Sequence, residues 1–150
     1  MKRFTLMFSV LLVVVFTIPL ASYALCVNVP YMANLRSGPG KKYRIIWQVY
    51  KYMPLQELSS SGNWYRVRDI DGDIEYIEKP LVTSGYSCAA VRSKTAILRT
   101  GPGINYPDKY RGDARKYDSF RVIREEGPWV EVRSDFNQTG WINKKSLWIR

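Results

Sequence analysis

A decapeptide that occurs twice limits what this chain can fold into more than any other feature. The stretch "NLRSGPGKKY" at residues 34–43 returns 63 residues later as "ILRTGPGINY" at residues 97–106. The segments that follow the two copies also stay aligned, with an offset that drifts only from 63 to 65 residues. A fixed internal period predicts two structural units of one design. We therefore expect a first repeat over residues 25–85 and a second repeat over residues 86–150.

Each repeat has the composition of short β-strands joined by turns. The segments "IIWQVY", "PLQEL", "WYRVR" and "IEYIE" are rich in β-branched or aromatic residues, and Gly, Asn, Asp or Ser separates them. The Gly-Pro-Gly triplets predict tight turns, because Pro fixes φ and Gly permits positive φ. No window has a sustained helical period. The chain is therefore expected to be all-β, with about five strands per repeat closed into a small barrel.

The first 24 residues have the layout of a secretory signal peptide. Lys2 and Arg3 precede an apolar block over residues 6–20, and the triplet Ser-Tyr-Ala at 22–24 suits a cut after residue 24. We expect residues 1–24 to be removed and the protein to be exported to the periplasm or the extracellular space. The mature chain would then have no stable membrane insertion. An uncleaved membrane anchor is the alternative.

Charge and the absence of histidine narrow the possible functions. The chain has 23 Lys and Arg against 13 Asp and Glu, so loss of Lys2 and Arg3 leaves 21 basic residues and a net charge of +8. A basic exported protein meets anionic polymers of the envelope before it meets nucleic acid, which makes nucleic acid the least expected partner. The chain has no His, and no pairing of a nucleophile with a base can be recognised. We therefore expect no enzyme activity and no cofactor.

The two cysteines occupy matching places in the repeats. Cys26 lies nine residues before Leu35, and Cys88 lies ten before Leu98. In an oxidising compartment an even pair at such places favours a disulfide, although two separate buried thiols are the alternative. Two sulfurs without a histidine do not predict a zinc site. The acidic stretch "DIDGD" at 69–73 predicts a hairpin turn rather than a calcium loop, because the rest of a calcium loop is missing.

The alternation of a strand assigns faces to the segments that carry the aligned tryptophans. In "WYRVR" it places Val67 inward and Trp64 outward, beside charged residues. In "WVEVR" it places Val130 and Val132 inward and Trp129 outward. An exposed Trp at the same place in both repeats is a candidate platform for a ligand. A Trp that packs on the rim of the barrel is the alternative.

These motifs resemble those of a known family. "NLRSGPG" followed by "YRIIWQVYKYMPLQEL" and "NWYRVRDIDG" is similar to the bacterial SH3-like domain, a small binding barrel found on exported proteins and cell-wall enzymes. The resemblance covers both repeats and implies two tandem SH3-like β-barrels. The first repeat departs from the pattern, since it has Glu75 and Tyr76 where the second has Gly140 and Trp141.

The resemblance also implies where a ligand binds. In that family the groove lies between the loop after the Gly-Pro-Gly turn and the strand that carries the Trp. Carried over to this chain, the ligand-binding residues are Tyr43, Trp64 and Tyr76 in the first repeat and Tyr106, Trp129 and Trp141 in the second. Arg36 and Arg99 belong to the same motif, but an Arg before a tight turn is expected to bond to backbone carbonyls instead.

The function expected from these observations is that of an exported, non-catalytic binding module. Its expected partner is a cell-wall peptide, as in peptidoglycan, or another envelope component, which it would contact through exposed aromatic residues. An adaptor that binds an envelope protein is the alternative.

Overall fold

The computed structural model describes residues 23–109 and 113–150. The expected signal peptide therefore lies outside the described residues except for its last two. Within the described ranges the regular elements are β-strands and two single-turn 3₁₀ helices, so the prediction of an all-β chain is confirmed. None of the helices in these ranges is long and apolar enough to cross a membrane.

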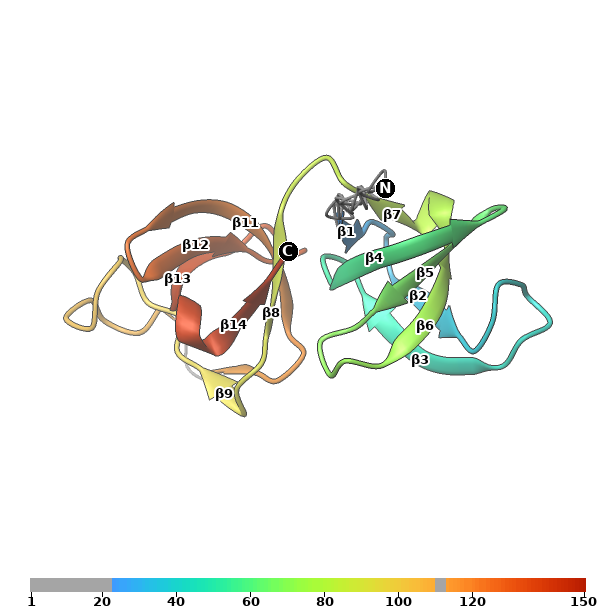
Figure 1. The fold of residues 1–150 in the computed structure, drawn as a ribbon. Helices are drawn as coiled ribbons and strands as arrows, with labels where there is room; N and C mark the ends of the chain where they lie inside the picture. The colour runs from blue at the N-terminus through green and yellow to red at the C-terminus, as the bar shows by residue number, and fades with distance from the viewer. Residues whose placement is uncertain (1–22, 110–112) are drawn as a thin grey trace, which may run out of the picture.

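The first repeat forms a seven-stranded antiparallel sheet of order β3-β2-β6-β5-β4-β1-β7 (Figure 1). Its sheet wraps around one core, to which Leu35, Val67 and Ile77 contribute fully buried side chains. β1 and β7 are additional to the strands expected from the sequence, because they are too short to show a pattern. The elements are β1 (Ala24–Val27), β2 (Met32–Arg36), β3 (Ile45–Tyr50), β4 (Pro54–Ser61), β5 (Trp64–Arg68), β6 (Ile74–Glu78), the 3₁₀ helix η1 (Lys79–Leu81) and β7 (Val82–Thr83).

The second repeat forms a five-stranded antiparallel sheet of order β13-β12-β11-β8-β14 and a separate pair, β10-β9. Val130, Val132 and Ile142 are fully buried in its core, as the alternation predicts for both valines. The elements are β8 (Cys88–Val91), β9 (Thr95–Ala96), β10 (Ala114–Arg115), β11 (Ser119–Glu126), β12 (Trp129–Arg133), β13 (Thr139–Asn143), the 3₁₀ helix η2 (Lys144–Ser146) and β14 (Leu147–Ile149).

The two repeats share backbone φ angles that the sequence pattern does not predict. Tyr52 and Tyr117 occupy aligned positions, and both have a positive φ, of 69° and 75°. The glycines of the two long hairpins, Gly62 and Gly127, agree still more closely, with φ of 55° and 54°. No sheet extends from one repeat into the other among the described residues. The division into domains at residues 85 and 86 stays a prediction.

The strand β8 joins the repeats and is covered on both faces. Its four residues have no exposed surface, and Figure 1 places it at the boundary between the two repeats. Ala90 packs in the core of the first repeat, whereas Ala89 and Val91 pack in the core of the second. Small side chains suit a strand between two packed layers.

A disulfide fastens this junction. Cys26 of β1 is bonded to Cys88 of β8, with 5.9 Å between their Cα atoms, so the predicted bridge is confirmed. Tyr52 and Tyr86 pack around it with their rings edge to face, at a centroid distance of 5.7 Å.

Candidate functional site

The repeated decapeptide builds a turn on which a tyrosine ring rests. A Cβ atom at Gly38 would lie 2.5 Å from the ring of Tyr43, and one at Gly101 would collide in the same way with the ring of Tyr106. Glycine is therefore required at both positions so that the ring can lie against the backbone. Both tyrosines are exposed, and the ammonium of Lys42 lies 5.3 Å from the centre of the Tyr43 ring.

The arginine of the decapeptide holds the same turn closed. Arg36 donates a hydrogen bond from Nη1 to the backbone carbonyl of Tyr43 at 2.8 Å, and Arg99 donates the equivalent bond to the carbonyl of Tyr106, also at 2.8 Å. Arg99 additionally pairs with Asp108 at 3.2 Å. The expectation that these arginines bond to backbone carbonyls is confirmed, and they are occupied in a structural role.

The expectation that Trp129 lies on an open face is wrong. Trp129 keeps only 8% of its surface exposed and Trp141 only 5%. The guanidinium of Arg124 lies 4.9 Å from the centre of the Trp141 ring, and its Nε donates to Glu131 at 2.7 Å. The planar guanidinium of Arg124 thus covers the ring of Trp141. The presence of charged neighbours was therefore a poor guide to exposure.

In the first repeat the corresponding residues are half-buried. Trp64 lies opposite Glu78 across the β5–β6 pair, and Tyr76 lies opposite Arg66. Tyr76 also pairs with Arg36 of β2, which brings the end of the decapeptide beside β6. Of the six residues carried over from the resemblance, Tyr43 and Tyr106 are thus the exposed ones.

A hollow of about 370 Å³ lies beside Trp129 in the second repeat. The loop after the Gly-Pro-Gly turn contributes Ile104, whose side chain is 76% exposed, and Asn143 at the end of β13 contributes a polar wall. Arg99 and Asp113 also line the hollow, which we call the second-repeat groove. It lies where the resemblance implies, but Tyr106 and Trp141 do not line it. Ile104 was not among the predicted site residues, although an isoleucine directly after a Gly-Pro-Gly turn is a signal in the sequence.

The equivalent place in the first repeat is bridged by an ion pair. Lys41 occupies the position of Ile104, and Glu78 occupies the position of Asn143. The ammonium of Lys41 lies 3.8 Å from the carboxylate of Glu78. An exposed pair of this kind contributes little stability, but it places charge where the second repeat has an apolar side chain and a neutral amide.

Glu75 is a buried carboxyl that the sequence analysis did not identify. Its side chain is 3% exposed, and its Oε2 has no hydrogen-bond partner among the described residues. Burial, reinforced by the nearby charges of Asp69 and Asp73, raises the pKa of Glu75 to about 7. The second repeat has Gly140 here, where an added Cβ would lie 2.9 Å from Leu98. The described part of the second repeat therefore has no carboxyl at the position that matches Glu75.

The acidic stretch before Glu75 forms a turn closed by its own first side chain. Asp69 is buried, and its Oδ1 accepts hydrogen bonds from the backbone N–H groups of Asp71 and Asp73 at 2.9 and 2.8 Å. The predicted hairpin turn is present between β5 and β6. This carboxylate is committed to the backbone.

Comparison with known proteins agrees with this architecture for the first repeat. Residues 29–84 match the bacterial SH3 domain family. The chain is also 26% identical over 122 residues to the putative N-acetylmuramoyl-L-alanine amidase YrvJ of Bacillus subtilis (strain 168). That match covers 75% of this chain but 23% of the relative, so the chain spans about a quarter of the length of the curated protein it matches.

Three solved structures are similar over most of the chain. NlpC1 of Trichomonas vaginalis is 13% identical with a TM-score of 0.39, covering 94% of this chain and 50% of its own. NlpC2 of the same organism is 12% identical with a TM-score of 0.37, covering 85% and 48%. An NlpC/P60 family protein of Bacillus cereus ATCC 10987 is 11% identical with a TM-score of 0.37, covering 85% and 56%. At these TM-scores the likeness supports no further argument.

Proposed function

With residues 29–84 placed in the bacterial SH3 domain family, we propose that the chain is an exported, non-catalytic tandem binding module for peptidoglycan or another cell-wall component. The tandem arrangement rests on the shared decapeptide turn and the shared arginine clamps of the two repeats. Export rests on the layout of residues 1–24 and agrees with the Cys26–Cys88 disulfide, since such bonds persist in oxidising compartments.

The second-repeat groove is the observation that supports this function most. It combines an apolar wall, made by Ile104 and the edge of Trp129, with the polar groups of Asn143 and Asp113. Concave sites that mix a large apolar surface with a few polar groups are typical of ligand binding. Ile104 is 76% exposed, and a ligand in the groove would cover its side chain.

The first repeat is proposed to bind the same ligand more weakly or not at all. The pair formed by Lys41 and Glu78 stands across the equivalent place. A ligand that enters there must separate the pair and desolvate both charges, and it gains no apolar contact with an isoleucine in return.

A cell-wall component is a better candidate than an envelope protein for two reasons. The similar region of the Bacillus subtilis relative belongs to a protein named as a putative N-acetylmuramoyl-L-alanine amidase, and we propose that both chains meet the same N-acetylmuramoyl peptide material. The basic charge of the mature chain also suits an anionic wall.

Sedimentation of the purified mature protein with insoluble peptidoglycan tests the proposal. We expect the protein to pellet with peptidoglycan and to stay in solution with cellulose. We also expect part of the binding to persist in about 0.5 M NaCl, because salt screens exposed charges and leaves apolar contacts in place. A protein that stays in solution with peptidoglycan, or that pellets equally with cellulose, would show that the proposed function is wrong.

A further inference from the structure

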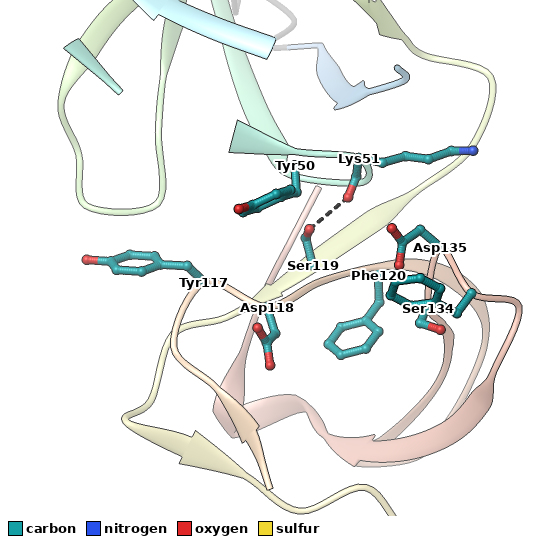
Figure 2. A pocket seen from close by; sticks show the side chains of 9 residues that line it. Tyr50, Lys51, Tyr117, Asp118, Ser119, Phe120, Ser134 and Asp135 are labelled. Atoms are coloured by element: carbon teal, nitrogen blue, oxygen red, sulfur yellow. Dashed lines mark hydrogen bonds between the residues drawn. The ribbon is translucent and has the colours of Figure 1, made fainter. Parts of the chain in front are cut away.

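A second cavity, of about 360 Å³, lies between the two repeats (Figure 2). Tyr50, at the end of β3, lines it from the first repeat. The second repeat contributes two segments: the end of the β10–β11 connection with the start of β11, and the turn between β12 and β13. The first of these segments carries Asp118 and Phe120. The turn between β12 and β13 carries Asp135 and Phe136. We call this cavity the junction pocket.

The walls of the junction pocket are fixed to one another. The hydroxyl of Ser119 donates to the backbone carbonyl of Lys51 at 2.8 Å, a bond drawn in Figure 2. Tyr117 donates from its hydroxyl to Asp71 at 2.7 Å, and its ring meets Trp47 edge to face at 5.2 Å. The pocket therefore exists only while the two repeats are docked, and these contacts hold its shape.

The charged residues that line the pocket are two aspartates, Asp118 and Asp135, and one lysine, Lys51. Asp135 makes no hydrogen bond or ion pair with any described residue, and Asp118 accepts one bond, from the backbone N–H of Arg115 at 2.8 Å. The ammonium of Lys51 lies 5.2 Å from the ring of Tyr52, and Figure 2 shows it pointing away from the carboxylates. Two carboxylates against one ammonium leave the lining residues with a net charge of −1, in a chain whose net charge is +10.

Aromatic rings surround these carboxylates. Phe136 is 82% exposed and Tyr50 is 61% exposed, whereas Phe120 is buried between the two aspartates in the view of Figure 2. Ring faces attract cations, and exposed rings gain when a ligand covers them. An anionic ligand would be repelled by both carboxylates, so the combination favours a ligand that is positively charged and small enough for the pocket.

We propose that the junction pocket binds the ammonium group of a peptide. Asp118 and Asp135 supply the countercharge, and Tyr50 and Phe136 cover the alkyl carbons next to the nitrogen. The pocket is separate from the second-repeat groove, so this inference does not depend on the proposed function. Because residues of both repeats line the pocket, neither repeat could form this binding site alone.

Isothermal titration calorimetry with the dipeptide Gly-Lys, up to about 10 mM, tests the inference. We expect saturable binding that the doubly acetylated dipeptide does not show. The two singly acetylated forms distinguish the sources of the ammonium, because the form that still binds retains the group that the pocket recognises. Absence of binding by the free dipeptide, or equal binding by the doubly acetylated one, overturns the proposal.

Variants place the binding in the junction pocket. Asp135→Asn removes one exposed carboxylate without changing its size and is expected to weaken binding about fivefold, as is Phe136→Ala. Glu126→Gln makes the same change in charge at the last residue of β11, beside the hairpin that precedes β12, and is expected to bind like the wild type. Ile104→Lys, in the second-repeat groove, should also leave dipeptide binding unchanged. If Asp135→Asn and Glu126→Gln weaken binding equally, the interaction is general charge attraction and the proposal is wrong.

Discussion

Replacement of Glu75 should change how the stability of this protein depends on pH. Its pKa rises from 4.5 to about 7 in the folded chain, first because of burial and then because of the charges of Asp69 and Asp73. Each pKa unit corresponds to about 1.4 kcal/mol, so ionising this buried carboxyl costs about 3 kcal/mol. That is a large fraction of the roughly 5–15 kcal/mol by which small proteins are stable.

The direction of the effect follows from proton linkage. Between pH 4.5 and about 7 the folded state binds more protons than the unfolded state, so the free energy of unfolding falls as pH rises. Well below pH 4.5 Glu75 is neutral in the folded and in the unfolded state, so the free-energy cost of ionising the buried carboxyl is absent. Above pH 7 the cost is present in full. The contribution of Glu75 to the free energy of unfolding should therefore be more favourable at pH 5 than at pH 8.

Urea unfolding followed by circular dichroism at pH 5, 6.5 and 8 measures the effect. The wild type is expected to lose about 2.5 kcal/mol across this range, whereas Glu75→Gln should lose much less, because its amide does not ionise. Glu126→Gln, which alters an exposed carboxylate, serves as the control and should keep the wild-type profile. If Glu75→Gln keeps the same loss between pH 5 and pH 8, then Glu75 does not titrate as its burial implies.

Two further substitutions test the packing. Trp141→Ala should lower the free energy of unfolding by about 3–5 kcal/mol, because the ring is buried under Arg124; a change below about 1 kcal/mol in urea unfolding would show that the ring is not packed there. Joint replacement of Cys26 and Cys88 by Ala should lower it by up to about 4 kcal/mol through the loss of a cross-link spanning 62 residues, and unchanged unfolding would mean that the junction is held by packing alone.

Features encoded by local pattern could be predicted from the sequence. The strand alternation placed Val67, Val130 and Val132 correctly, because one buried face gives a clear period of two. The role of Arg36 and Arg99 was also predictable, because their partners lie within the same turn. The matching places of Cys26 and Cys88 in the repeats favoured a bridge over two separate buried thiols, and the bridge is present.

Features that depend on contacts distant in sequence could not be predicted. The burial of Trp141 comes from Arg124 on β11, which is not adjacent to β13 in the sheet. Glu75 looks like an ordinary polar residue of an alternating strand, but the register of β6 with β5 pairs it with Val67, and it points inward. The junction pocket arises only when two repeats dock, and no pattern within either repeat encodes that surface.

The most direct test of the proposed function compares two variants in one sedimentation experiment with purified peptidoglycan. Ile104→Lys places a charge in the second-repeat groove, and Ile46→Lys makes the same change on the exposed face of β3 in the first repeat. We expect Ile46→Lys to pellet like the wild type and Ile104→Lys to remain largely in solution. Equal pelleting of the two variants would contradict the account, because the groove beside Trp129 would then not be where the wall binds.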